Sequence, residues 1–306
     1  MKKKAKNFVS DLRHNKILWI MLLPVIAYYI IFCYLPMFGI VIAFEDFSPA
    51  LGVFKSRWVG LKNFVDFFSG IYAWRLIRNT FLMGLYDIAV NFTAPIIFAL
   101  LLNEIGNKFF KRLSQTISYM PYFISVVVVC GLVINFTSSS GVISTFVAWI
   151  AGTTPENLLA NPAYFRAINV LSGLWQGLGY GSIIYLAALS SVSQELYEAA
   201  RIDGAGYFQQ MLHITLPAIA PTIILMLIMR IGMIMGTGGD KILLLYSPAT
   251  YETADVISTY TYRMAFDGAG NYGLSAAVGL FNSVINTILL LAANGISKKF
   301  SETSLF

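Results

Sequence analysis

The sequence predicts an all-α membrane protein with six transmembrane helices, and three observations lead to this prediction. Of the 306 residues, 57% are hydrophobic and only 12% are charged, about half the charged fraction of a soluble globular domain. Long stretches without a charged residue recur along the chain, as expected where a charge at the bilayer centre costs about 2.5 to 3.5 kcal/mol. Aromatic residues make up 15% of the chain and there are 24 glycines, which suits helices that anchor at membrane interfaces and pack closely.

The charge-free stretches locate the helices, because roughly twenty residues cross the hydrocarbon core. Five stretches contain no Asp, Glu, Lys or Arg, and a sixth is interrupted only by Asp87. The expected transmembrane helices are 17–43, 79–103, 115–136, 168–190, 217–237 and 273–296. The first follows the basic segment MKKKAK, but it is about twice as long as the apolar region of a signal peptide, so we expect it to remain as a helix.

One of the five charge-free stretches, 113–155, is too long for the single helix 115–136. Residues 135–141 are rich in serine and favour a turn. The apolar residues that remain, 142–151, are too few to cross a membrane. They predict a short helix that lies at the membrane surface or dips into it.

The distribution of Lys and Arg predicts that both termini are cytoplasmic. Twelve of the 21 lie in the tail 1–16, in the second and fourth connections and in the tail 297–306, against eight on the other side. Cytoplasmic segments carry the excess of positive charge, and the charges nearest a span have the greatest weight. The expected organisation is a basic tail, a first helix, a core domain over 79–296 and a second short tail.

The loop 191–216, between the fourth and fifth helices, carries the sharpest motif in the chain. From Glu198 to Pro217 it reads E-A-A, three residues, G, nine residues, I-x-L-P. By the charge distribution this loop lies on the cytoplasmic side. Seven specified positions at fixed spacing form a far more specific signal than an ordinary hairpin would give.

Elementary helix chemistry accounts for much of this motif. Ser193 can cap a helix over 194–203, which is too short and polar to be stable alone. Gly204 can then end it in the left-handed region without steric cost. A second short amphipathic helix is expected over 206–214, and Pro217 then opens the fifth transmembrane helix. A marginal helix of this kind needs another protein to pack against.

The motif resembles the coupling helix of permease subunits in ATP-binding-cassette (ABC) importers. The chain also resembles the carbohydrate-uptake branch of these permeases, which includes the maltose-type permeases. The weaker matches that indicate this branch are Asn79-Thr80, Tyr119-Met120-Pro121 and 258–263. The resemblance implies the type I ABC importer permease fold. It also implies an ATPase-contacting surface made of Glu198, Ala199, Ala200, Arg201, Asp203, Gly204, Tyr207 and Phe208. The chain lacks the two extra N-terminal spans and the large extracytoplasmic insertion of the larger maltose subunit.

The same resemblance implies a permease of the bacterial cytoplasmic membrane that moves a sugar or oligosaccharide by alternating access. Its partners would be a second homologous permease, two ATPase subunits and an extracytoplasmic solute-binding protein, with lipid around the spans. The chain has no G-x-x-x-x-G-K-[ST] motif, so ATP and Mg²⁺ are expected on the separate ATPase and no cofactor on this chain. Its basic residues lie between apolar runs, which argues against a nucleic-acid partner.

Two charged residues, Asp87 and Arg230, fall well inside expected spans. Each lies about 12 Å from the outer face at 1.5 Å per residue. Equal depth permits an ion pair or a hydrogen-bonded network. The alternatives are that one of them faces the translocation path or that their side chains reach outward to the interface.

A sugar would require aromatic faces against its ring and amide or hydroxyl groups for its hydroxyls. The candidates at suitable depth for the substrate path are Tyr119, Tyr122, Trp175, Gln176, Tyr180, Arg230, Asn282 and Asn286. The alternative for each is packing or bridging between helices, with the substrate site held by the partner permease.

Other function classes lack the necessary residues. The two histidines, His14 and His213, have no carboxylate or cysteine at metal-ligand spacing, and no G-x-S-x-G motif occurs, so neither an enzyme nor a metal site is expected. An ion-coupled carrier would need several intramembrane carboxylates, whereas only Asp87 is present. An ABC permease for a peptide, an amino acid or an anion remains the main alternative.

Overall fold

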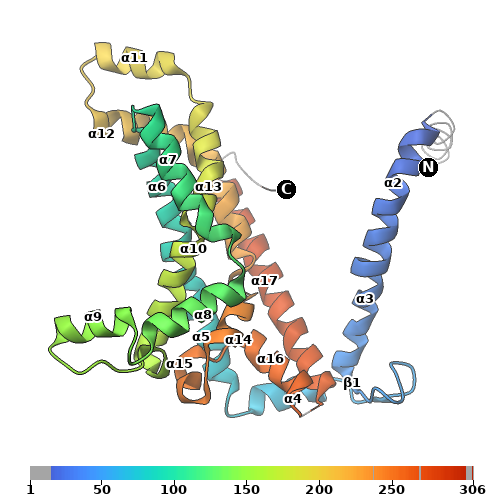
Figure 1. Ribbon diagram of the computed structural model, residues 1–306. Coiled ribbons are helices and arrows are strands. Elements are labelled where there is room, and N and C mark those ends of the chain that lie inside the picture. The colour runs from blue at the N-terminus through green and yellow to red at the C-terminus, as the bar shows by residue number, and fades with distance from the viewer. Residues whose placement is uncertain (1–14, 237, 269, 301–304, 306) are drawn as a thin grey trace.

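The computed structural model of the protein describes residues 15–236, 238–268, 270–300 and 305, which form mostly helices. Residues 1–14 of the expected basic tail, including His14, lie outside this range, as do 301–304 and 306 of the second tail. Figure 1 shows a helical rod near the N-terminus and a bundle that contains the remaining long helices. Rod and bundle meet at one end of the molecule and are separate along most of their length.

The rod covers the first expected helix, 17–43, as one helical run whose hydrogen-bonding pattern changes along its length. Its parts are α2 (Lys16–Tyr28), the π-helical η1 (Tyr29–Tyr34), α3 (Leu35–Met37) and the 3₁₀-helical η2 (Phe38–Phe44). Pro36 lies in the first turn of α3 and cannot donate a backbone hydrogen bond, and the wider η1 precedes it. No residue of α2 is buried, whereas at the foot of the rod Asn63 donates to the carbonyls of Ala43 and Glu45, both at 3.0 Å.

The second expected helix, 79–103, begins earlier than the sequence predicts. It consists of α5 (Ala73–Asp87), the π-helical η3 (Ile88–Phe92) and α6 (Thr93–Asn103). Arg75 and Arg78 keep its first turns out of any charge-free window, yet Leu76 of that segment is fully buried. The charge-free window therefore finds the apolar part of this helix and omits its first turns, which carry Arg75 and Arg78.

The third expected helix, 115–136, is two helices in the structure. α7 (Lys108–Tyr119) and α8 (Val126–Thr137) run in different directions and are joined by the 3₁₀-helical η4 (Met120–Phe123). Pro121 has no N–H to continue α7, and the Ser125 hydroxyl accepts from the Val128 N–H at 3.4 Å to begin α8. Hydropathy stays high across this break, which is why it predicts one helix. The short helix expected over 142–151 is α9 (Val142–Ala151), and the 3₁₀-helical η5 (Leu158–Ala160) follows.

The region expected as a loop 191–216 and a fifth helix 217–237 also differs from the prediction. The second short helix is continuous with the span, through α12 (Tyr207–Gln210), the π-helical η6 (Met211–Thr215) and α13 (Leu216–Ile231). Pro217 lies inside this run, directly after the wider η6, and the run ends at Ile231. The fourth expected helix, 168–190, lies within α10 (Pro162–Ser190), and α11 (Gln194–Ile202) follows it.

Short elements gather at the end of the bundle opposite α11 (Figure 1). After α13 the chain forms η7 (Ile234–Gly236), α14 (Gly239–Leu245), η8 (Pro248–Thr250), α15 (Tyr251–Ala254) and α16 (Ile257–Phe266) before the sixth long helix, α17 (Tyr272–Phe300). The antiparallel strands β1 (Glu45–Asp46) and β2 (Arg57–Trp58) and the helix α4 (Lys62–Ser69) lie at the same end. We call this end, from η7 to α16, the platform.

The platform is held together by a buried ion-pair network. The side chain of Asp255 is fully buried and lies 2.7 Å from the Arg263 guanidinium and 3.6 Å from that of Arg75. Burial alone would lower the pKa of Arg263, but hydrogen bonds to Asp255 and Tyr246 and the charge of Asp255 raise it above its usual value. Arg263 therefore stays protonated at any physiological pH.

Five stretches of the described chain are long and apolar enough to cross a membrane. They are Lys16–Phe44, Ala73–Asn103, Val126–Ala151, Tyr207–Ile231 and Tyr272–Lys299. α10 is not among them, although its 29 residues rise about 44 Å. Its polar residues, such as Arg166, Asn169 and Gln176, lower its hydropathy.

Candidate functional site

The motif helix α11 has the ends that its local chemistry predicts. The Ser193 side chain accepts a hydrogen bond from the Glu195 N–H at 3.3 Å. At the other end Gly204 has φ +76°, a conformation that costs a residue with a side chain about 1 to 2 kcal/mol. The Ala205 N–H then donates to the Ala200 carbonyl at 2.8 Å, which closes the helix end.

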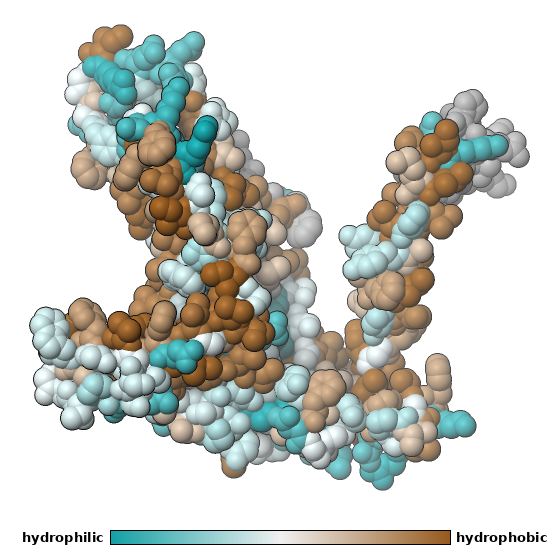
Figure 2. Space-filling model, in the orientation of Figure 1, coloured by the Kyte–Doolittle hydropathy of each residue, from teal (hydrophilic) through white to brown (hydrophobic). Residues whose placement is uncertain are grey.

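α11 projects from the end of the bundle, where Figure 1 shows it beyond α6, α7 and α13. No residue of α11 is buried, and Ile202 keeps 87% of its surface exposed. Figure 2 shows mostly hydrophilic residues over this end. Of the eight residues expected to contact an ATPase, Ala200 is half-buried, and seven are exposed: Glu198, Ala199, Arg201, Asp203, Gly204, Tyr207 and Phe208. We call these eight residues the coupling surface.

A polar groove of about 530 Å³ lies between α11 and the ends of α6, α7 and α12. It is lined by members of the coupling surface, including Glu198 and Arg201, and by Glu104 and Lys111. Glu104 and Lys111 are not predictable from the motif, because they lie about ninety residues from it in the chain. The groove therefore presents charges of both signs at its surface, as the polar rim of a protein–protein interface does.

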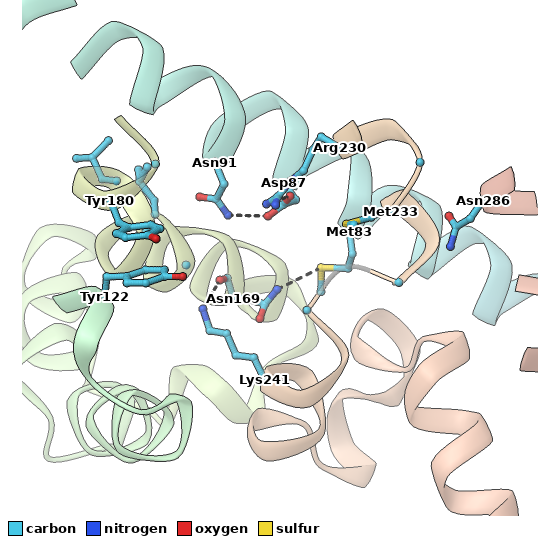
Figure 3. Close-up of a pocket in the computed structure, with 18 residues that line it drawn as sticks. Met83, Asp87, Asn91, Tyr122, Asn169, Tyr180, Arg230, Met233, Lys241 and Asn286 are labelled. Carbon is cyan, nitrogen blue, oxygen red and sulfur yellow. Dashed lines mark hydrogen bonds and ion pairs between the residues drawn. The ribbon is translucent and has the colours of Figure 1, made fainter. Parts of the chain in front are cut away.

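A second cavity, of about 600 Å³, opens in the middle of the bundle. Its polar lining comes from α5 and η3 (Asp87, Asn91), η4 (Tyr122), α10 (Asn169, Tyr180), α13 (Arg230), α14 (Lys241) and α17 (Asn286). Figure 3 shows these side chains around one open space. We call it the central cavity.

Asp87 and Arg230 form an ion pair in this cavity. Asn91, one helical turn further along, donates to the other carboxylate oxygen of Asp87 at 2.9 Å. The side chain of Asp87 is 11% exposed and that of Arg230 is 40% exposed. The pair bridges two helices and also presents the Arg230 guanidinium to the cavity. An ion pair and a residue that faces a translocation path are therefore compatible interpretations.

Tyr122 and Tyr180 stack face to face on another side of the cavity, with ring centroids 3.7 Å apart and an angle of 3° between the planes. Figure 3 shows the stacked rings across the open space from Asp87 and Arg230. Exposed aromatic faces bind the apolar face of a sugar ring, and polar groups opposite them can bind its hydroxyls.

Lys241 and Asn169 complete the cavity and were not among the candidates from the sequence. The Lys241 ammonium donates to the Asn169 backbone carbonyl at 2.8 Å. Lys241 lies on α14, beyond the expected fifth helix, in a stretch with no expected structure. The signal that could have found it is a lone cation directly before the apolar run Ile242–Leu245.

The structure brings together half of the residues expected along a substrate path. Four line the central cavity: Tyr122, Tyr180, Arg230 and Asn286. Trp175 instead lines a separate apolar groove between α8 and α10, and Gln176 donates to the Ile124 carbonyl at 3.0 Å. Tyr119 and Asn282 do not line the cavity either, and the buried Asn282 side-chain oxygen has no hydrogen-bond partner among the described residues.

Comparison with known proteins agrees with this architecture. Residues 91–302 match the family described as binding-protein-dependent transport system inner membrane component. The chain is 43% identical over 304 residues to Protein LplB of Bacillus subtilis (strain 168), and the aligned region covers 99% of this chain and 95% of that relative. It is 39% identical over 306 residues to the polygalacturonan/rhamnogalacturonan transport system permease protein YteP of the same organism, covering 100% and 95%.

Solved structures show the same fold. One chain from a bacterial ABC transporter involved in the import of the acidic polysaccharide alginate is 40% identical, with a TM-score of 0.88, and the match covers 96% of this chain and 99% of that chain. A chain of the bacterial alginate transporter in complex with an alginate pentasaccharide-bound periplasmic protein gives the same identity and TM-score, with 97% and 99% covered.

Proposed function

The chain belongs to the family of binding-protein-dependent transport system inner membrane components, and we propose that it is the permease through which an ATP-driven importer moves an oligosaccharide into the cell. It is a membrane-embedded transport subunit and not itself the ATPase. The observation that carries the proposal is the exposed motif helix α11, which no other part of the described chain covers. The oligosaccharide is supported by the polysaccharides named for YteP and the alginate transporter and by the stacked tyrosines of the central cavity.

In this proposal six segments cross the membrane, with the kinked pair α7 and α8 as the third and α10 as the fourth. The rise of about 44 Å makes α10 long enough, even though its polar residues lower its hydropathy. In Figure 1 the N-terminal end of α2 and the C-terminal end of α17 point toward the same end of the molecule as α11. Together with the excess of Lys and Arg, this common end supports a cytoplasmic location for the termini and the coupling surface.

The proposed partners follow from surfaces that this chain leaves open. Two ATPase subunits, which bind ATP and Mg²⁺, would supply the cleft for α11. A second permease would close the central cavity, since Arg230 is partly exposed and a neighbouring cavity of about 610 Å³ shares Arg230 and Tyr180 with it. A solute-binding protein would dock on the opposite, extracytoplasmic end, as a periplasmic protein is present in the alginate transporter complex.

One helix connects the coupling surface with the central cavity. The run from Tyr207 to Ile231 spans 25 residues, or about 38 Å, from the coupling surface to Arg230. A push on α11 when the ATPase dimer closes would therefore reach the Asp87–Arg230 pair through the continuous helix Tyr207–Ile231. Alternating access would follow if that push tilts α13 against α5 and α10, because packed helices shift between discrete arrangements rather than bending continuously.

The test is co-expression with the expected partners followed by purification and uptake into proteoliposomes. The chain should co-purify with an ATPase and a second permease, and oligosaccharide uptake should require ATP and the binding protein. Glu198→Lys should abolish uptake while the protein remains in the membrane, because it reverses a charge on the coupling surface. Uptake by the chain alone, normal uptake by the variant, or uptake of peptides or amino acids in place of oligosaccharides would contradict the proposal.

A further inference from the structure

Lys241 is a buried cation in the central cavity, and the ion pairs of the described chain do not use it. It is only 9% exposed. An ammonium has three N–H donors, and one of these binds the Asn169 carbonyl. A buried charge without an ion-pair partner is costly, and a ligand that brings a negative group would offset that cost.

The charges that line the cavity do not balance. Among the described lining residues Asp87 is the acidic one, whereas Arg230 and Lys241 are basic. The Asp87 carboxylate is already engaged by Arg230 and by the Asn91 amide. One positive charge is therefore left over, and a ligand with a negative group would compensate it.

The surroundings of Lys241 fit a polar ring with a carboxylate. Side-chain oxygens of Asn91 and Asn169 are buried without a hydrogen-bond partner among the described residues, so they can accept from hydroxyls. Gly173 faces this corner, where an added Cβ would lie 3.4 Å from the Lys241 nitrogen and 3.1 Å from the Asn91 amide nitrogen. The glycine thus keeps space open beside the ammonium, and Tyr122 and Tyr180 offer their aromatic surface nearby (Figure 3).

We propose that the central cavity takes an acidic oligosaccharide and that Lys241 binds the carboxylate of one uronate residue. The proposal deepens the proposed function and rests on it, because it assigns the class of sugar that the same cavity accepts. The uronate ring would lie near the tyrosines, its carboxylate at Lys241 and its hydroxyls at Asn91 and Asn169. Lys241 would act as a specificity-determining residue.

The experiment uses the complete importer in proteoliposomes with saturating binding protein. The probes are trimers of galacturonate, mannuronate and glucuronate, the methyl ester of each, which keeps the ring but removes the charge, and a neutral glucose trimer. The ratio of acid to ester uptake is measured for the wild type and for Lys241→Gln. The selectivity of the binding protein contributes equally to the wild type and to Lys241→Gln. It therefore cancels in the comparison, and the change in this ratio reports on Lys241 alone.

We expect the wild type to take up at least one acidic trimer and Lys241→Gln to lower its acid-to-ester ratio by about tenfold, the effect of losing a charge-assisted hydrogen bond. Lys241→Arg, which keeps the positive charge, should preserve most of the ratio. Lys62→Gln removes a cation from the exposed face of α4 and should leave the ratio unchanged. Co-purification of the ATPase with each variant checks that the fold is intact.

Uptake of neutral but not acidic trimers by the wild type would overturn the inference and leave the proposed function standing. An equal effect of Lys241→Gln on acid and ester, or no effect on either, would overturn it as well. If Lys241→Gln does not assemble, loss of the acid preference in Lys241→Arg, with assembly intact, would overturn it, and retention would support it. Failure of the wild type to take up any oligosaccharide would instead contradict the proposed function itself.

Discussion

The two ends of this molecule are built in opposite ways. At one end α11 has no buried residue, and the Tyr197 hydroxyl, hydrogen-bonded to Thr215 at 3.0 Å, attaches it to the neighbouring helix. At the other end the platform holds Asp255 fully buried between two arginines. Two of the three apolar clusters of the described chain also lie at the platform end. The difference teaches that buried charges and apolar clusters stabilise the platform end, whereas α11 is held by few contacts and stays exposed.

The contacts of the two ends also differ in range along the chain. The Asn79 amide donates to the carbonyls of Glu252 and Asp255, which lie 173 and 176 residues away, and Arg166 donates to its side-chain oxygen at 2.9 Å. The hydrogen bonds that cap the two ends of α11 join residues only two to five positions apart. Substitutions in the platform should therefore change the free energy of unfolding, whereas substitutions in α11 should change transport.

The largest expected effect on stability is that of Asp255→Asn. Removing the carboxylate leaves Arg263 and Arg75 without their buried partner, which should lower the free energy of unfolding by about 3 to 5 kcal/mol. Denaturation of the detergent-solubilised protein, followed by circular dichroism, measures this change. Asp267→Asn is the matched control, since Asp267 is exposed in the same part of the chain and its loss should cost less than about 0.5 kcal/mol. Equal effects of the two substitutions would remove the contrast between the ends.

A smaller effect is expected for the pair that lies between the two ends. Asp87→Asn should lower the free energy of unfolding by about 2 kcal/mol, less than Asp255→Asn because the Arg230 side chain is 40% exposed and solvent screens its charge. Transport should fall as well, since Arg230 also faces the cavity. The double reversal Asp87→Arg with Arg230→Asp should recover more than half of the stability lost in either single reversal. A double variant no better than the singles would show that the residues do not act as a pair.

α11 is predictable from sequence because its limits are set by neighbouring residues. Ser193 caps one end and Gly204 closes the other, and both effects act over a few positions of the chain. The position of Lys241 in the central cavity depends instead on a contact with Asn169, 72 residues away. No local pattern reports such a contact, so the cavity was found only in part, through the aromatic and charged residues on the long helices.

Hydropathy did not predict the kinks of the helices, for a related reason. Hydropathy reports how long an apolar stretch is, and it does not report its direction. The stretch around Pro121 stays apolar while the chain turns from α7 to α8, and the stretch around Pro217 continues as one helix because η6 widens before it. The same residue type thus breaks one helix and is accommodated in another, where a wider π-helical turn precedes it.

Gly204→Val should have a modest effect on stability and a large effect on transport. Gly204 has φ +76° with no atom within 4 Å of an added Cβ, so the cost is backbone strain of about 1 to 2 kcal/mol. That strain falls on the end of α11, and uptake should drop to background while the protein remains in the membrane. Gly52→Val introduces the same strain, at φ +69° and in equally open space, in the β1–β2 loop. Uptake by the two variants separates the effect of position from that of strain, and equal losses would argue against a special role for α11.

The smallest effect on stability is expected for Ile202→Ser. Ile202 is 87% exposed, so its loss should change the free energy of unfolding by less than about 0.5 kcal/mol. Burial of an isoleucine in a partner's cleft contributes about 1.5 to 3 kcal/mol, so binding of the ATPase should weaken by about tenfold or more. Ile71→Ser is the matched control, because Ile71 is 84% exposed in the turn between α4 and α5 at the other end. ATPase retained during purification of each variant measures the difference. Since both side chains are free in the isolated chain, a loss confined to Ile202→Ser can only arise in the assembly, whereas equal retention would mean that α11 does not seat in the ATPase.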